Sequence, residues 1–365
     1  MDGALVWLIL ARAPGVGRIR LAKLMNAYPD PADAWRARSW DLMAVEGWSR
    51  QTAEALVAVR GSTEARREAE AEWENAKAAG LKLVAMSDAD YPVRLRYTVD
   101  PPPYFYQAGP WLPDARPVIA IVGTRKPTSY GLAVAERFGR DLARLGAVVV
   151  SGMARGIDCA AHRGALEAGG STVAVLGGGA DVCYPREAGP IYRAIRDTGA
   201  VISEQPPGAE PRSEFFPERN RIISGLAHGI VVVEAGEKSG TLITVAQAIS
   251  QGRDVFAVPG PITSPMSVGP HALLRDGAVL ATSAEQILEE LGFERKAMVL
   301  PAGRRPELDS EQERVLGWMG GEPRWAGDLA EVCGLPAGQV QGMLTMLELK
   351  GLVRQLPGGQ YLRIG

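Results

Sequence analysis

The sequence is poor in the residues from which metal sites, disulfide frameworks and acid–base active sites are usually built. Its 365 residues include three cysteines and three histidines. Cys159, Cys183 and Cys333 lie far apart and show neither zinc-ligand spacing nor the density of a disulfide scaffold. The histidines form no Ser-His-Asp order and no metal-ligand pattern. We therefore expect no metal, no cofactor and no catalytic residue, in a protein of a reducing cytoplasm.

An excess of positive charge and long hydrophobic runs are also missing. The formal net charge is −2, so any site for a polyanion must be local rather than spread over the surface. The apolar run at residues 4–11 is too short to span a membrane and has no basic segment before it, so we expect neither a membrane anchor nor a signal peptide. With 46% hydrophobic and 22% charged residues, the composition is that of a soluble globular protein.

Arginine, by contrast, is abundant. It supplies 33 of the 40 basic residues, against 7 lysines. The planar guanidinium binds phosphate through two parallel hydrogen bonds and stacks on flat rings, so this bias is typical of proteins that bind nucleic acid. A GC-rich genome produces the same bias, and composition alone leaves both explanations open.

From residue 117 onward, short apolar runs rich in β-branched residues alternate with helical patterns. Strands that are apolar on both faces and separated by helices predict a parallel sheet covered by helices on both sides. Two further strands are expected earlier, in 81–86 and 104–106. We assign residues 63–292 to one α/β domain, a doubly wound, extended Rossmann-like sheet. The expected parallel strands are 118–122, 147–151, 173–176, 200–203, 230–234 and 254–258.

Shorter helical segments precede this domain. Within residues 1–62, a Pro-Gly-Val-Gly turn at 14–17 separates two apolar helical stretches, and residues 45–48 repeat the arrangement. Tight glycine turns between short helices are typical of a SAM-like or helix-hairpin-helix bundle, whose hairpins can present backbone N–H groups to a DNA phosphate. The same turns also serve as plain helix connections, so both interpretations stay open.

A linker at residues 293–306 leads to a C-terminal segment, 307–365. This segment shows three helical patterns and then a hairpin with Gly358-Gly359 at its turn, which predicts a winged helix-turn-helix. Five basic and eight acidic residues give it a net charge of −3. A winged helix that docks on DNA usually presents a basic face, so we expect this one to bind protein rather than DNA.

The loops that follow the expected parallel strands contain both glycines and cationic side chains. Ligands of open α/β sheets bind beyond the carboxyl ends of the strands, where glycine lets backbone N–H groups approach an anion and helix N-termini add positive potential. These loops therefore predict a phosphate-binding rim. Alternatively, some glycines only form tight turns, and some arginines pair with Glu218 or Asp181. The candidate rim residues are Gly123, Arg125, Lys126, Gly152, Arg155, Gly156, Arg186, Phe216, Arg219, Asn220, Arg221, Lys238, Ser239, Gly240 and Thr241.

The familiar nucleotide signatures are absent from these loops. Residues 123–129 do not form a GxxxxGK[ST] P-loop, and the stretch 177–182 departs from GxGxxG because Val182 stands at the sixth position. ATP hydrolysis and dinucleotide binding are therefore not expected. Asp158 is expected to be the N-cap of the helix after the second loop.

Three aromatic side chains, Tyr184, Phe215 and Phe216, stand beside arginines in the rim loops. Bases of single-stranded nucleic acid stack on exposed aromatic rings for roughly 1–3 kcal/mol each, while arginines hold the backbone. Adjacent residues of an extended segment point to opposite sides, so we expect one of the two phenylalanines to be in the core. Together these features favour sequence-tolerant binding of single-stranded nucleic acid.

Six longer motifs run through these loops, namely VGTR (122–125), SGMARGIDCAAH (151–162), VAVLGGGADVCYP (173–185), FPERNRIISGL (216–226), EAGEKSGTLIT (234–244) and GRDVFAVPG (252–260). With these motifs the sequence resembles the DNA-processing protein A family (DprA, also called Smf). The resemblance covers residues 80–292 and, more weakly, both flanking segments. It implies a dimeric, non-catalytic mediator that binds single-stranded DNA, protects it during natural transformation or repair, and helps to load RecA.

The resemblance also assigns residues to DNA contacts. At two positions near the rim the sequence departs from the family pattern, because Ala188 and His271 stand where members often have asparagine. The implied contacts do not extend to these two positions. The side chains that the resemblance places on DNA are Arg125, Arg186, Phe216, Arg219 and Arg221.

The loop arrangement is also similar to that of nucleoside-monophosphate phosphoribohydrolases, which carry a PGGxGTxxE motif. The comparable stretch here is 238–244, where Thr244 replaces the glutamate that an oxocarbenium-forming hydrolase needs. Without that carboxylate, cleavage of the glycosidic bond has no general acid or electrostatic stabiliser. A nucleotide hydrolase is therefore the second interpretation.

Overall fold

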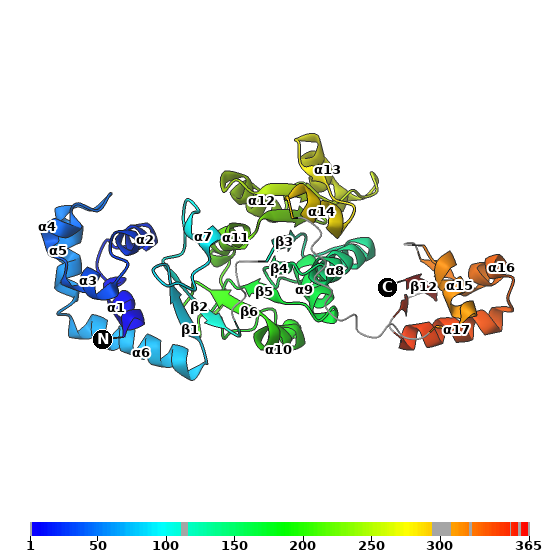
Figure 1. Ribbon diagram of the computed structural model, residues 1–365, viewed down its shortest axis with the longest axis horizontal. Helices are drawn as coiled ribbons and strands as arrows, with labels where there is room; N and C mark the ends of the chain where they lie inside the picture. Colours follow the sequence, from blue (N-terminus) through cyan, green and yellow to red (C-terminus); the bar gives the residue numbers. More distant parts are fainter. Residues whose placement is uncertain are drawn as a thin grey trace. The chain divides into compact units, whose positions relative to one another are not determined.

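The computed structural model describes residues 2–110, 116–293, 308–320, 323–350, 352–356 and 359–363. The chain divides into two compact units, residues 1–300 and 301–365, and each is described by itself (Figure 1). The expected linker, 293–306, lies outside the described residues except for Phe293. In the described parts of the chain, no helix has the length and hydropathy needed to cross a membrane.

The N-terminal part of the first unit is built from short helices, α1 Gly3–Leu10, α2 Arg18–Ala27, α3 Pro31–Arg36, α4 Ser39–Leu42 and α5 Arg50–Val59. Gly15 and Gly47 both have a φ of +79°, a left-handed conformation that glycine adopts without steric cost. The side chain of Arg20 donates to the carbonyl oxygens of both, at 2.7 Å to Gly15 and 3.0 Å to Gly47. The two repeated glycine turns therefore lie side by side.

Helix α6, Thr63–Ala78, connects these helices to the sheet. The Ser62 side chain caps its first turn. Further along the helix, the Glu72 carboxylate accepts hydrogen bonds from Arg12, just after α1, at 2.7 Å, and from the hydroxyl of Tyr106 in the sheet. One helix thus contacts both parts of the unit.

The described part of the first unit holds a sheet of nine strands in the order β1-β2-β6-β5-β4-β3-β7-β8-β9. The strands are β1 Lys82–Ala85, β2 Tyr104–Ala108, β3 Val118–Val122, β4 Val148–Ser151, β5 Thr172–Val175, β6 Ala200–Ser203, β7 Gly229–Val232, β8 Asp254–Ala257 and β9 Val279–Leu280. Strands β3 to β9 pair in parallel, whereas β1 and β2 extend one edge in antiparallel fashion. The strand order reverses at β3, which pairs with β4 on one side and β7 on the other. Loops diverge at such a reversal and leave room for a ligand.

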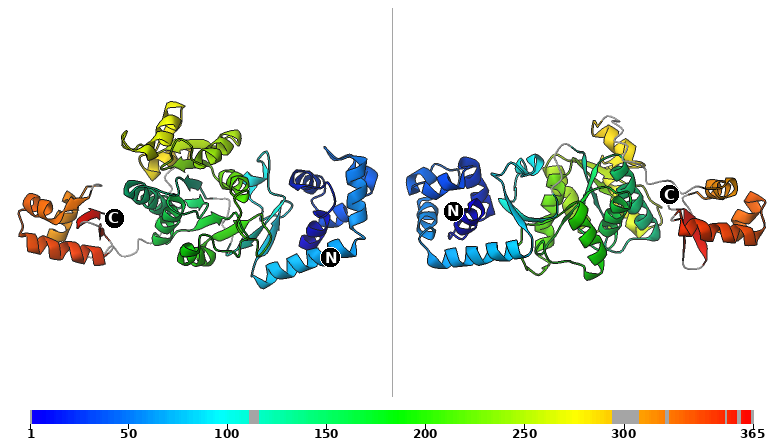
Figure 2. Two further views of the ribbon diagram at one scale, coloured as in Figure 1. Left: turned by 180° about the vertical axis from the view of Figure 1, so that it is seen from behind. Right: turned by 60° about the horizontal axis from the view of Figure 1, so that its bottom comes forward.

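Helices cover both faces of this sheet (Figures 1 and 2). They are α7 Val93–Arg96, α8 Ser129–Arg144, α9 Ile157–Glu167, α10 Gly189–Thr198, α11 Phe215–Leu226, α12 Thr241–Ser250, α13 Val268–Arg275 and α14 Ala284–Glu290. Successive residues of β3 face two different cores: Ile119 and Ile121 belong to the core with α8, α9 and α14, whereas Ala120 and Val122 belong to the core with α10, α11 and α12. The doubly wound parallel sheet predicted from the sequence is confirmed, as are the two strands expected in 81–86 and 104–106. The antiparallel pairing of these two strands and the short strand β9 were not predicted.

The second unit is a winged helix. Its elements are α15 Ser310–Trp318, β10 Arg324–Trp325, α16 Ala326–Cys333, α17 Ala337–Leu349, β11 Val353–Gln355 and β12 Gln360–Arg363. The strands pair antiparallel in the order β10-β12-β11, and helices and sheet share a core that contains Val315, Leu329, Leu344 and Tyr361. This confirms the winged helix predicted from the sequence; Gly358 of the expected turn lies outside the described residues.

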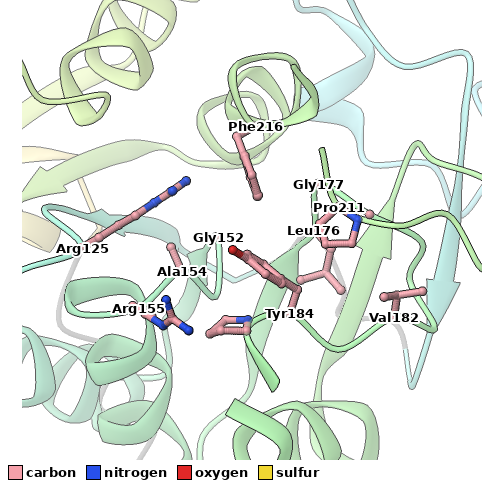
Figure 3. A pocket seen from close by; sticks show the side chains of 12 residues that line it. Arg125, Gly152, Ala154, Arg155, Leu176, Gly177, Val182, Tyr184, Pro211 and Phe216 are labelled. Atoms are coloured by element: carbon pink, nitrogen blue, oxygen red, sulfur yellow. The ribbon is translucent and has the colours of Figure 1, made fainter. Parts of the chain in front are cut away.

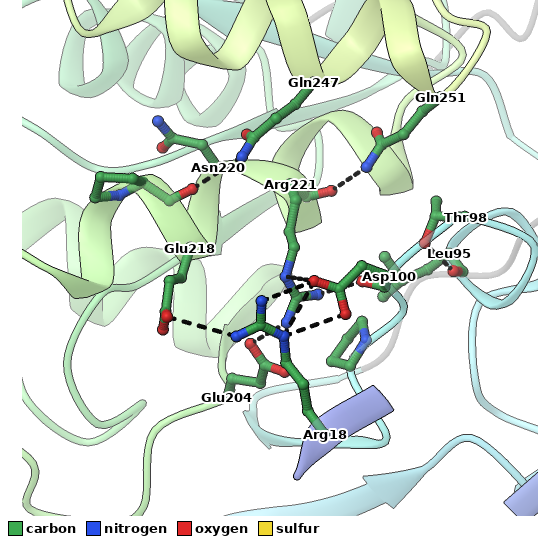
Figure 4. A network of polar contacts seen from close by, with 12 residues as sticks. Arg18, Leu95, Thr98, Asp100, Glu204, Glu218, Asn220, Arg221, Gln247 and Gln251 are labelled. Carbon is green, nitrogen blue, oxygen red and sulfur yellow. Dashed lines mark hydrogen bonds and ion pairs between the residues drawn. The ribbon is translucent and has the colours of Figure 1, made fainter. Parts of the chain in front are cut away.

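A network of ion pairs joins α2 to α11 (Figure 4). Arg221 of α11 is buried and donates to the Glu204 carboxylate at 2.5 and 2.6 Å and to the backbone carbonyl of Asp100 at 2.7 Å. Arg18, the first residue of α2, pairs with Asp100 at 2.9 Å and with Glu218 at 3.4 Å. Burial raises the pKa of Glu204, and the nearby Arg221 guanidinium opposes that rise. Removal of one partner from such a buried pair leaves the other charge uncompensated.

We expect Arg221→Ala to lower the free energy of unfolding by about 3–5 kcal/mol, because Glu204 would stay buried without its cation. Urea unfolding followed by circular dichroism measures this change. Arg18→Ala is the control: its side chain is 42% exposed, so its loss should cost about 1 kcal/mol or less. Equal losses for the two variants would contradict the structural role assigned to Arg221.

Candidate nucleic-acid-binding site

A small cavity lies at the edge of the sheet where β4 and β5 end (Figure 3). Its volume is about 40 Å³, which accommodates a few water molecules or a group of similar size. The loops after β3, β4, β5 and β6 and the first turn of α11 form its walls. The lining residues are Arg125, Gly152, Ala154, Arg155, Leu176, Gly177, Gly178, Val182, Tyr184, Pro185, Pro211 and Phe216.

The backbone of Gly152, at the wall of the cavity, is held by two buried charged side chains. The Asp158 carboxylate accepts the amides of Gly152 at 3.2 Å and Ala154 at 3.3 Å, and Arg219 donates to the carbonyl oxygens of Gly152, at 2.6 Å, and Val175. Burial raises the pKa of Asp158 to about 6 and lowers the pKa of Arg219 to about 10. A Cβ on Gly152 would lie 2.6 Å from the Arg219 guanidinium, so the close approach requires glycine.

Two sequence-based expectations are corrected here. Asp158 is not an N-cap: Gly156, with a φ of +84°, holds that position, and Asp158 lies in the first turn of α9. Residues 215–221 are not a loop but the first turns of α11, whose helical period turns several side chains toward the sheet. Arg219 and Arg221, expected at an exposed rim, are therefore only 6% and 5% exposed. Arg219 donates to the backbone of Gly152 and does not line the cavity itself. Arg221 belongs to the ion-pair network with Glu204 (Figure 4).

Phe216 is the centre of an aromatic and cationic cluster at the cavity (Figure 3). The guanidinium carbon of Arg125 lies 4.8 Å from the centroid of the Phe216 ring, and the ring centroids of Tyr184 and Phe216 are 6.0 Å apart. Tyr184 is 41% exposed, so its ring is accessible from solvent.

Phe215 lies beside Arg212 instead, with 5.8 Å between the guanidinium carbon and the ring centroid. Both phenylalanines are half-buried on a helix, so the expectation that one of them is in the core is wrong.

The other cations of the expected rim differ in their pairing. Arg155 donates to the carboxylate of Glu187, which follows the exposed Arg186 in the 3₁₀ turn Arg186–Ala188. Lys126 is exposed in the loop after β3, and Lys238 is exposed in the loop after β7. Neither lysine lines the cavity.

Several candidate residues have structural positions instead. A Cβ on Gly123 would lie 2.5 Å from the Ile157 side chain, and one on Gly156 would lie 2.5 Å from the carbonyl oxygen of Thr124, so both glycines allow close packing. Asn220 is half-buried on α11. At the start of α12, the hydroxyls of Ser239 and Thr241 are 3.0 Å apart beside Gly240. None of these residues lines the cavity.

Sequence reasoning missed the apolar part of the wall, namely Leu176, Val182 and Pro211. These residue types carry no chemical signal of a ligand. Pro211 also comes from a segment that no motif singled out. Only its position after β6, on the same edge of the sheet, marks it as a neighbour of the other loops.

No carboxylate, histidine or thiol is among the described residues that line the cavity. Thr244, at the position of the hydrolase glutamate, is buried in α12. At the two positions that depart from the family pattern, Ala188 is buried and His271 makes a 3.0 Å hydrogen bond with the carbonyl oxygen of Gly260. The cavity wall therefore offers cationic and aromatic side chains to a ligand.

Fold and site together define a Rossmann-like protein with an arginine- and glycine-lined edge, followed by a winged helix. Residues 82–292 match the family model described as DNA recombination-mediator protein A, and residues 300–359 match that of the DprA winged helix domain. The chain belongs to the DNA recombination-mediator protein A family.

Individual relatives extend this similarity over the whole chain. The sequence is 31% identical to protein Smf of Synechocystis sp. over 98% of each chain, and 43% identical to DNA processing protein DprA of Bacillus subtilis over 58% of this chain and 72% of that one. The X-ray structure of DNA processing protein A from Streptococcus pneumoniae matches with a TM-score of 0.67 at 31% identity, covering 80% of this chain and 98% of that one. The Helicobacter pylori protein, solved to explain its single-stranded DNA binding mode, matches with a TM-score of 0.53 at 28% identity over 58% of this chain and 95% of that one.

Proposed function

We propose that the chain is a recombination mediator that binds single-stranded DNA and has no catalytic activity of its own. One observation carries the proposal: Arg125, Phe216 and Tyr184 cluster at a glycine-lined cavity on the carboxyl edge of the sheet. Arginine side chains suit phosphates, while accessible ring faces suit unstacked bases. The single-stranded DNA binding mode described for the Helicobacter pylori relative supports the same function.

The chemistry of the cavity favours DNA binding over cleavage of a nucleotide. Its described lining residues include no carboxylate, the group that ordinarily serves as general acid and as nucleophile or base in glycosidic cleavage. Release of free base from AMP by the purified protein would overturn this ranking of mediator over hydrolase.

We expect the protein to bind a single-stranded oligonucleotide more tightly than the corresponding duplex, with affinity that falls steeply as salt rises. Arg125→Ala and Arg186→Ala should each weaken binding and flatten the slope of log K against log[salt] by about 0.7 for each lost phosphate contact. Fluorescence anisotropy of a labelled oligonucleotide over a salt series measures both quantities.

Arg137→Ala is the control for these variants. Arg137 lies on α8, is 70% exposed and pairs with Asp141 of the same helix, so its removal should change neither affinity nor slope. Unchanged slopes for the Arg125 and Arg186 variants would place the DNA elsewhere. Absence of binding to either form of DNA would refute the proposed function.

The two adjacent phenylalanines allow a test of base stacking. Phe216→Ala should weaken binding of single-stranded DNA by about 1–3 kcal/mol, because its ring lies at the cavity beside Arg125 and Tyr184. Phe215→Ala is the matched control, since Phe215 lies beside Arg212 instead. The salt slope should stay constant in both variants, because no charge is removed. Equal losses of affinity would show that Phe216 has no specific role.

We further propose that the protein works as a homodimer in the cytoplasm, delivers DNA to RecA in natural transformation or repair, and uses its second unit to bind protein. The family membership supports the first two points. For the third, α17 occupies the place of the helix that DNA-binding winged helices insert into the major groove. Its exposed, described side chains carry no charge and therefore provide no cation to pair with phosphate; they are Ala337, Gln339, Gln341, Thr345 and Met346, with Gly338 and Gly342 between them.

Deletion of residues 307–365 should leave the affinity for single-stranded DNA unchanged, because the cavity lies in the first unit. Anisotropy measurements on the shortened chain check this, and its ability to start RecA filaments on the same oligonucleotide is recorded in parallel. Loss of DNA binding on deletion would place DNA contacts in the second unit and contradict the proposal.

A further inference from the structure

The two cationic side chains that line the cavity, Arg125 and Arg155, differ in whether a carboxylate pairs with them. Arg125 stacks on Phe216 and has no carboxylate partner among the described residues, whereas Arg155 is paired with Glu187. Glu187 follows Pro185, a lining residue, by two positions, so the pair links the loop after β4 to the loop after β5 at the cavity. The side chains of Arg155 and Glu187 are 62% and 58% exposed, and the contact lies in solvent.

We propose that Glu187 limits the affinity of the cavity for phosphate by holding a carboxylate of the protein itself on Arg155. This inference rests on the proposed binding of single-stranded DNA. Carboxylate and phosphate bind the same guanidinium fork through the same charge-assisted hydrogen bonds, so they compete for it. A phosphate that enters must either displace Glu187 or bind beside its negative charge.

The energetics of the pair suit an exchangeable partner. An exposed ion pair adds little to folding stability, so release of Arg155 costs the fold little. The hydrogen bond from Arg155 holds the pKa of Glu187 below its ordinary value, so the carboxylate is charged at neutral pH. A negative charge a few ångströms from a phosphate is unfavourable even in a high dielectric.

This arrangement selects for a chain of phosphates over a single one. A lone phosphate makes contacts only inside the cavity, and these contacts alone must compensate for the repulsion by the Glu187 carboxylate and its competition for Arg155. A DNA strand also makes contacts outside the cavity, including one with the exposed Arg186. These contacts keep a phosphate of the strand at high effective concentration beside Arg155, where it competes with Glu187. Glu187 is thus a specificity-determining residue for polyanions.

Glu187→Gln should tighten binding of a single-stranded oligonucleotide about threefold to tenfold at low salt, because one repulsive charge is removed near the phosphate. The slope of log K against log[salt] should steepen by about 0.7, because Arg155 becomes available to one more phosphate. Adding Arg155→Ala to this variant should abolish both gains. If the pair only braced the two loops, Glu187→Gln would weaken binding or leave the slope unchanged, and either result overturns the inference.

Glu167→Gln is the matched control. Glu167 is the last residue of α9 and pairs with Arg140 at 2.9 Å, away from the cavity, so its neutralisation should change neither affinity nor slope. Arg125→Ala in the same titration distinguishes failure of the proposed binding site from failure of the proposed role of Glu187. If Arg125→Ala has no effect, the proposed binding site itself is wrong. If Arg125→Ala weakens binding but Glu187→Gln does not tighten it, only the role of Glu187 is wrong.

Discussion

The cavity depends on one backbone position, Gly152, where two buried charges hold the chain. Asp158 accepts its N–H and Arg219 donates to its carbonyl oxygen, so the wall of the cavity is hydrogen-bonded before any ligand arrives. Each buried charge has lost its hydration, and hydrogen bonds to the backbone compensate part of that loss. The guanidinium occupies the place where a side chain at Gly152 would stand. A wall built in this way needs little reorganisation on binding, which leaves more of the contact energy for affinity.

Helix α11 connects this site to the rest of the first unit. Phe216 and Arg219 lie on its cavity side, while Glu218 and Arg221 belong to the network that includes Arg18. Arg18 opens helix α2, directly after the first glycine turn. The helix that carries the aromatic ring is therefore held by contacts on two sides. The N-terminal helices contribute to the position of the site even though the described lining of the cavity contains none of their residues.

The sequence predicted the features that depend on local pattern. Runs such as 118–122 are apolar at every position, which is typical of a strand buried on both faces. A helix-covered parallel sheet could be predicted from these runs, and the strand pairing agrees with it. Arg125, Gly152, Arg155 and Phe216 were placed at one edge because the carboxyl ends of parallel strands meet there, and all four line the cavity. Exposure within 215–221 was mispredicted, because it depends on whether the segment is extended or helical. The two conformations turn different residues inward.

The partners of the arginines were the other feature that sequence patterns did not predict, and they decide which cations are available to an anionic ligand. Arg155 and Glu187 are 32 residues apart and meet only through the sheet. Arg219 and Arg221 are also occupied, by backbone carbonyls and by Glu204, whereas Arg125 has no carboxylate partner among the described residues. In a chain with a net charge of −2, attraction for a polyanion is confined to the range of the Debye length, about 10 Å at 0.1 M salt. Within that range each carboxylate next to an arginine reduces the local positive charge. Under the proposed function, affinity for DNA would therefore depend on which arginines are unpaired rather than on how many the chain contains.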